Sequence, residues 1–189
     1  MRPSTLGART RLLGAAVAFV ALVGCSSKPA AQPLGSSTAA PAGLSATVYA
    51  ASGFSIRPPQ GWTKNDSGKL GAKVFFFGPR QLDFTVNINV VSESARGTNV
   101  DQYVQAGKPQ LAQALTGYTQ VEDRSLTVNG QPAHILGGTF KQGAFKLRNR
   151  QLFVVRNDVA YVVTATALES TWSTYEALID ASIKTFRAS

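Results

Sequence analysis

Two alternating segments on either side of Asn129-Gly130 constrain the fold of this chain more than any other feature. They run from Tyr118 to Val128 and from Gln131 to Lys141. An Asn-Gly pair between segments of this kind is the strongest short-range signal for a tight β-hairpin. A second pair of segments meets at another turn in the same way, at Asn157-Asp158 between Lys146–Arg156 and Val159–Leu168. The second half of the chain therefore predicts an antiparallel meander.

The first half predicts shorter strands and one helix. The strand segments are Ala46–Ala50, Phe54–Arg57, Val74–Phe77 and Phe84–Val90, of which the last alternates most regularly. The run Thr98-Asn99-Val100-Asp101 is typical of a capping box that opens a helix. Gly107 and Pro109 interrupt the apolar stripe of that helix, which predicts a kink or two short helices. Gly117 is expected to close it as a C-cap.

A last helix should begin near Ser170 or Ser173, either of which could cap it. Its apolar stripe includes Trp172, Ile179 and Phe186, which predicts packing against a sheet. The order of elements is strands, a helix, more strands and a final helix, without the rhythm of parallel βαβ units. The predicted fold class is α+β, with a central antiparallel sheet and helices packed on it.

Three stretches of the chain resemble the PsbP-like domain, which also occurs in DcrB-type and LpqN/LpqT-type bacterial lipoproteins. They are Gly53-Phe54-Ser55-Ile56 followed by Pro59-Gln60-Gly61-Trp62, the strand Thr85–Val91, and the run from Leu152 to Phe186. The resemblance spans roughly residues 46–187. It implies an α-β-α sandwich and a non-enzymatic accessory or docking role. No acidic or histidine pair matches a metal site, so neither metal binding nor photosystem association is inferred.

The N-terminus has the features of a bacterial lipoprotein signal. Positive residues precede an uncharged stretch, Leu12–Gly24, that is too short to cross a bilayer as a helix. The stretch ends in Leu22, Val23, Gly24 and Cys25, which resembles the lipobox. That resemblance implies that Cys25 receives lipid and that residues 1–24 are removed. A plain secretory peptide or an uncleaved anchor are the alternatives. Cys25 is the only cysteine in the chain, so no disulfide can form within it.

Residues 25–45 after the signal are rich in Ser, Ala, Pro and Gly, which predicts a flexible linker of about 25 Å ahead of a domain at 46–189. Loss of three arginines with the signal lowers the formal charge from +9 to +6. A moderate positive excess on an exported domain favours an anionic surface or an acidic envelope partner over nucleic acid.

The sequence contains few candidate catalytic residues. His134 is its only histidine and lies between apolar residues in a predicted strand, so a structural role is expected. Its carboxylates are scattered, and the adjacent pair Glu122-Asp123 should point to opposite faces of a strand. Motifs for nucleotide binding, zinc binding and serine hydrolysis are missing from the sequence. No catalytic residue, cofactor or metal is therefore predicted, and Gly137-Gly138 is interpreted as a strand bulge.

One basic cluster stands out. Lys146, Arg148 and Arg150 alternate along one strand face, and Lys141 lies nearby. We name these four residues the basic patch. Burial of Phe145 and Leu147 on the other face should turn the three strand charges toward solvent. The patch is then either a solubility device or a docking surface for an acidic partner.

The sequence as a whole predicts a lipid-anchored envelope protein, facing outside the cytoplasm, that acts by binding. The alternatives are a carrier of small molecules or lipids with a cleft between sheet and helices, and an envelope enzyme accessory domain with an unrecognised pocket. A large apolar pocket would favour the carrier, and a cleft with perturbed carboxylates would favour the enzyme.

Overall fold

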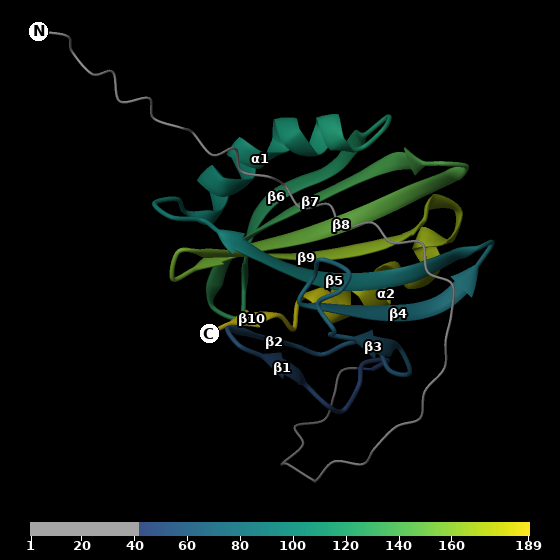
Figure 1. Ribbon diagram of the computed structural model, residues 1–189, viewed down its shortest axis with the longest axis horizontal. Helices are drawn as coiled ribbons and strands as arrows, with labels where there is room; N and C mark the ends of the chain where they lie inside the picture. Colours follow the sequence, from purple (N-terminus) through teal and green to yellow (C-terminus); the bar gives the residue numbers. More distant parts are fainter. Residues whose placement is uncertain (1–41) are drawn as a thin grey trace, which may run out of the picture.

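The computed structural model describes residues 42–189 (Figure 1). The predicted signal peptide, the lipobox with Cys25 and most of the predicted linker lie outside the described residues. Leu44 is buried and forms a bridge with Pro59. The packed part of the chain therefore begins slightly before Ala46.

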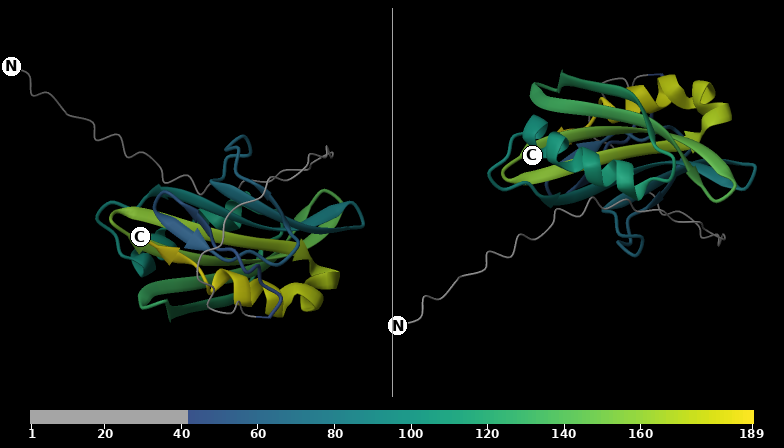
Figure 2. Two further views of the ribbon diagram at one scale, coloured as in Figure 1. Left: turned by 90° about the horizontal axis from the view of Figure 1, so that it is seen from below. Right: turned by 90° about the horizontal axis from the view of Figure 1, so that it is seen from above.

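An antiparallel sheet with the strand order β3-β4-β5-β9-β8-β7-β6 forms the centre of the molecule (Figures 1 and 2). Its strands are β3 Thr63–Asn65, β4 Val74–Gln81, β5 Phe84–Ser94, β6 Thr119–Val128, β7 Gln131–Gln142, β8 Phe145–Arg156 and β9 Val159–Leu168. A smaller sheet has the order β1-β2-β10, with β1 Tyr49–Ala51, β2 Phe54–Ile56 and β10 Arg187–Ala188. The α+β class predicted from the sequence is confirmed.

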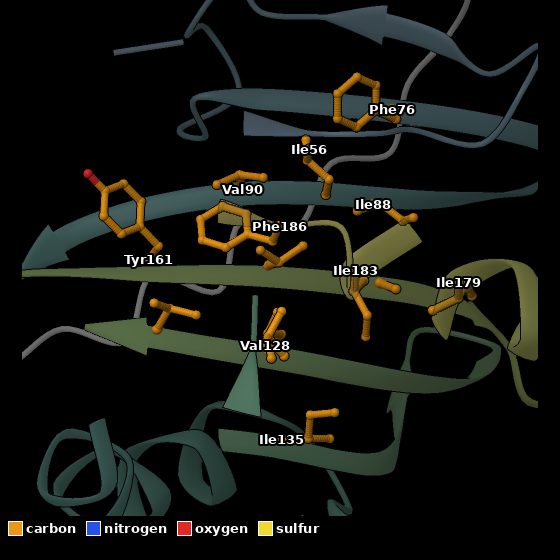
Figure 3. Close-up of a cluster of buried hydrophobic side chains, with 14 of the residues drawn as sticks. Ile56, Phe76, Ile88, Val90, Val128, Ile135, Tyr161, Ile179, Ile183 and Phe186 are labelled. Carbon is orange, nitrogen blue, oxygen red and sulfur yellow. The ribbon is translucent and has the colours of Figure 1, made fainter. Parts of the chain in front are cut away.

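The two faces of the central sheet bury separate cores. Helix α2 (Trp172–Ile183), preceded by the short 3₁₀ helix η1 (Glu169–Thr171), packs on one face together with the smaller sheet. Figure 3 shows this core, where Ile179 and Ile183 of α2 meet residues of both sheets. Helix α1 (Val100–Ala114) packs on the opposite face. Both sides of the middle strands are therefore covered.

The meander forms as its turn residues predict. Asn129 and Gly130 have φ angles of 51° and 78°, and Asn157 and Asp158 have φ angles of 50° and 59°. Positive φ at both central residues is the type I′ geometry, whose twist matches that of the flanking strands. The register follows, with Val128 opposite Gln131 and Arg156 opposite Val159.

Helix α1 starts with the predicted kind of cap but lacks the predicted break. Asn99 is the N-cap, and it exchanges hydrogen bonds with Gln102 in a capping box. The helix then continues through Gly107 and Pro109 as one element, so the expectation of two short helices is wrong. Pro109 lies on the exposed side of α1, where water can satisfy the carbonyl group that its missing N–H leaves free.

Two further boundaries differ from the prediction. Strand β4 continues past Gly78-Pro79, with a register shift between Phe77 and Arg80. Strand β3 pairs with β4 only as far as Phe77, so Pro79 lies on an edge where its missing N–H costs no ladder bond. Helix α2 has Thr171 as its N-cap without a side-chain cap bond, so neither Ser170 nor Ser173 caps it. The preceding 3₁₀ turn leads the chain into the helix instead.

Candidate binding site beside helix α1

A groove lies between α1 and the middle strands of the central sheet. Helix α1 covers the part of this face formed by β7 and β8, and the groove opens on the side toward β9 and β5. Its cavity has a volume of about 50 Å³. We call it the α1 groove, and the lining residues used below are Val91, Glu93, Tyr103, Val104, Gln151 and Phe153.

The pleat of the sheet places these side chains together. Val91, Val162 and Phe153 are direct neighbours across β5, β9 and β8, so they share one face. Glu93 follows Val91 by two residues and points to the same side. Tyr103 and Val104 come from the buried stripe of α1. The wall is thus largely apolar, with a few polar groups at its edges.

Glu93 is the acidic group of the α1 groove. Its carboxylate accepts a hydrogen bond from the Tyr103 hydroxyl, which ties α1 to β5. Partial burial raises the pKa of Glu93 above its usual range. Among residues 42–189, no lysine, arginine or histidine forms an ion pair with this carboxylate. Its negative charge is therefore left without a counter-ion within the described domain.

Gln151, which also lines the α1 groove, has a hydrogen-bond acceptor without a partner. The side chain is 8% exposed, and its Nε2 donates to Thr164 Oγ1 at 3.2 Å. Its Oε1 is buried without a hydrogen-bond partner. A buried polar atom of this kind costs free energy unless a ligand or water completes it.

A charged cluster fixes the other flank of α1. His134 of β7 is 4% exposed, with Nδ1 lying 2.9 Å from Asp101 of α1 and Nε2 lying 2.7 Å from Asp123 of β6. Ser125 donates to Asp101 at 2.8 Å, and Lys108 of α1 pairs with Asp123. We call these five residues the His134 cluster. Its contacts join α1 to two strands of the sheet.

The carboxylates of the His134 cluster are held in their ionised form. Hydrogen bonds from His134 and Ser125 lower the pKa of Asp101. Hydrogen bonds from Lys108 and then His134 lower the pKa of Asp123. Both ring nitrogens of His134 can donate at once only in the imidazolium form.

Serine, histidine and aspartate occur together in the cluster, but their geometry differs from that of a hydrolase. Ser125 Oγ lies 3.2 Å from His134 Nδ1, the nitrogen that also faces Asp101. Because a carboxylate occupies each nitrogen, His134 is poorly placed to take a proton from Ser125. The arrangement favours a clamp between helix and sheet. Within residues 42–189, no group of three or more His, Cys, Asp or Glu side chains is placed to hold a metal ion.

The four residues of the basic patch differ in their exposure to solvent. Lys141 and Lys146 lie directly opposite each other on β7 and β8, and both are exposed. Arg148 lies over the ring of Trp172, with its guanidinium carbon 4.8 Å from the ring centroid. Arg150 is only 8% exposed. The expectation that all three strand charges face solvent is therefore wrong for Arg150, because α2 covers that end of the strand.

Arg150 instead forms the buried centre of an ion-pair network whose outer carboxylates reach solvent. Its Nε lies 2.8 Å from Glu122, and its Nη2 lies 2.9 Å from Glu176 of α2. Asp180, one turn further along α2, is 3.6 Å from Nη1. Gly137 stands between Arg150 and Glu122 in the cross-strand row, and a Cβ there would lie 3.1 Å from the Glu122 Cβ. The missing side chain lets the two charged groups meet.

Two further predictions from the sequence, on Glu122-Asp123 and on Gly137-Gly138, can be compared with the structure. Glu122 and Asp123 do point to opposite faces, toward Arg150 and His134 respectively. The predicted bulge is real, but it lies in β6 between Gln120 and Glu122, opposite Gly137-Gly138. The α1 groove and the His134 cluster were not predicted, because the lining of the groove comes from five separate elements and the cluster from three. Neither helix of residues 42–189 is long and apolar enough to span a membrane.

Solved structures with the same fold include proteins from three bacteria. LpqN of Mycobacterium tuberculosis, described as involved in cell envelope biogenesis, has a TM-score of 0.60 and 15% identity over 70% of this chain and 81% of its own. Cyanobacterial PsbP of Synechocystis sp. PCC 6803 has a TM-score of 0.57 and 18% identity over 84% and 100%. A Pseudomonas aeruginosa protein of unknown function, PA94, described as a putative regulator, has a TM-score of 0.52 and 16% identity over 71% and 90%.

These similarities confirm the predicted PsbP-like fold. The comparison with curated proteins gave no match. The comparison with family models gave a match that covers nearly the whole described domain. The model for the serine/threonine kinase C-terminal domain spans residues 46–188, and this chain belongs to that family.

Proposed function

We propose that this chain is a lipoprotein anchored to the outer side of a bacterial membrane, and that its domain acts by binding rather than by catalysis. The observation that carries the proposal is the lipobox Leu22-Val23-Gly24-Cys25, placed about twenty residues before a folded domain. Such a spacing keeps the domain near the bilayer and still lets it turn. The envelope role described for LpqN, which has the same fold, supports this location.

A binding role agrees with the side-chain chemistry of the domain. The buried histidine contacts two carboxylates, and the buried arginine contacts three. Both sets stabilise packing between helices and the sheet. The α1 groove is the feature that favours the alternative of a small-molecule carrier, because it combines an apolar wall with unfilled polar groups.

Cys25→Ser should move the protein from the membrane fraction to the soluble fraction almost completely. The thiol is the only acceptor for lipid, and two acyl chains give stable anchoring where one chain is marginal. The measurement is membrane sedimentation after a high-salt wash, followed by immunoblotting. Ser26→Ala, one residue away, should leave the protein in the membrane fraction. Sedimentation of the Cys25→Ser protein with membranes would refute the anchor.

An acidic partner would meet the exposed lysines of the basic patch. Lys141 and Lys146 form no ion pair within residues 42–189, and they face each other across two strands. Reversal of both to Glu should leave the melting temperature unchanged and weaken binding to an anionic polymer such as teichoic acid. Wild-type binding should also weaken with salt. Equal binding by the two proteins at low salt would mean that the lysines serve solubility alone.

A further inference from the structure

The α1 groove has room for part of a small organic molecule. Its volume of about 50 Å³ is several times the roughly 10–15 Å³ that one water molecule needs. Val91, Val104 and Phe153 supply an apolar wall to which an aliphatic group can bind. Because α1 and the sheet are joined by the Glu93–Tyr103 bond at one edge and by the His134 cluster at the other, the walls are held in place.

The polar atoms that remain unfilled in this lining are acceptors. Glu93 has a second carboxylate oxygen beyond the one bonded to Tyr103, and Gln151 has an Oε1 without a partner. A ligand that satisfies them must bring hydrogen-bond donors. Since Glu93 has no counter-ion among residues 42–189, a donor that carries positive charge gains most. A ligand with a carboxylate or phosphate would place two negative charges together.

Aromatic rings beside the carboxylate add to the same preference. The rings of Tyr103 and Phe153 lie 6.3 Å apart at an angle of 51°. Both residues line the α1 groove, so an ammonium ion held at Glu93 would lie near aromatic rings, and a ring face within about 6 Å attracts such a charge. The apolar wall strengthens the attraction because it excludes water from around the charges.

We propose that the α1 groove binds a small aliphatic amine in its protonated form, with the ammonium group at Glu93 and the aliphatic part against Val91, Val104 and Phe153. Partial burial raises the pKa of Glu93 because the carboxylate loses hydration, and a cation beside it would offset that loss. Gln151 Oε1 would accept from a second donor on a longer ligand.

The test is calorimetric titration of the purified full-length chain with three probes of equal chain length. These are n-butylammonium, 1-butanol and butyrate. Butylammonium should bind at least about tenfold more tightly than butanol, which corresponds to one hydrogen-bonded charge, and butyrate should bind more weakly than either. Equal affinities for butylammonium and butanol, or an absence of saturable binding, would overturn the proposal.

Two variants separate charge from structure. Glu93→Gln keeps an oxygen that accepts from Tyr103 but removes the charge, so the fold should hold and butylammonium affinity should fall about tenfold, to that of butanol. Tyr103→Phe removes the internal bond but keeps the carboxylate, so butylammonium should still bind more tightly than butanol. Unchanged affinity in Glu93→Gln would refute the site. The site does not depend on Cys25, so the Cys25→Ser protein should bind butylammonium normally, and failure of either proposal leaves the other standing.

Discussion

Arg150→Met is expected to lower the free energy of unfolding by about 2 kcal/mol. Removal of one partner from a buried ion pair is destabilising because the remaining charge loses its compensation. The loss is partial here, since Arg124, Arg148 and Lys184 still pair with the three carboxylates that Arg150 contacts. Here the substitution leaves Glu122, Glu176 and Asp180 gathered around an apolar side chain. For a domain of this size the melting temperature should fall by about 4–8 °C.

Two neighbours on the same strand face provide matched controls. Arg148→Met loses the stacking on Trp172 but a weaker ion pair, 3.7 Å from Glu176, so about 1 kcal/mol is expected. Lys146→Met removes an exposed charge and should change stability by less than about 0.5 kcal/mol. Urea unfolding of the three variants should therefore show a graded series. Equal effects at all three positions would contradict the burial of Arg150 beneath α2.

The parts of the fold that the sequence predicts well are those set by local chemistry. Asn129-Gly130 and Asn157-Asp158 fix their hairpins because few residues accept the positive φ angles of a type I′ turn. The alternation of apolar and polar residues along β5 indicates which side chains lie on each face of the strand. The capping box at Asn99 positions the start of α1 through hydrogen bonds that span only three residues. None of these features needs a distant partner.

The boundaries that fail depend on the tertiary environment. A proline usually ends a helix, but Pro109 lies on the solvent-exposed face of α1. The opposite face of this helix packs on the sheet. Gly78-Pro79 usually ends a strand, yet the edge position of this half of β4 and a register shift accommodate both residues. A proline or glycine in the sequence does not by itself show whether its side of the helix or strand will face solvent.

The candidate sites could not be predicted from local sequence patterns either, because they too depend on contacts between distant elements. The period of two correctly groups Lys146, Arg148 and Arg150, but it cannot reveal that a helix more than twenty residues later covers one end of the row. Gly137 was the available signal, since a glycine within an apolar strand marks a close approach, here of Arg150 to Glu122. Asp101, Asp123 and His134 come from a helix and two strands, so only the folded chain shows that they meet.

The His134 cluster should make the domain sensitive to acid. In the folded state, hydrogen bonds hold the pKa values of Asp101 and Asp123 below 3.8, the usual value for an aspartate. The unfolded chain therefore binds more protons than the folded chain near that pH, and stability must fall as the pH decreases. The stabilisation is fully present above the unfolded pKa and is lost as the pH drops through the lower, folded values. Most of the loss is thus expected below about pH 4.

Comparison with His134→Gln isolates this effect. A glutamine amide has one nitrogen and cannot donate to both carboxylates as the two ring nitrogens do, so the urea midpoint of the variant at pH 5 should lie below that of the wild-type protein. As the pH falls through the folded pKa values of Asp101 and Asp123, both carboxylates become protonated in either protein, so the difference between the urea midpoints of the two proteins should shrink. Lys108→Met should show the same convergence with a smaller gap, since it acts on Asp123 alone. A gap that stays constant from pH 5 to pH 2 would mean that His134 stabilises the domain by packing and not through these carboxylates.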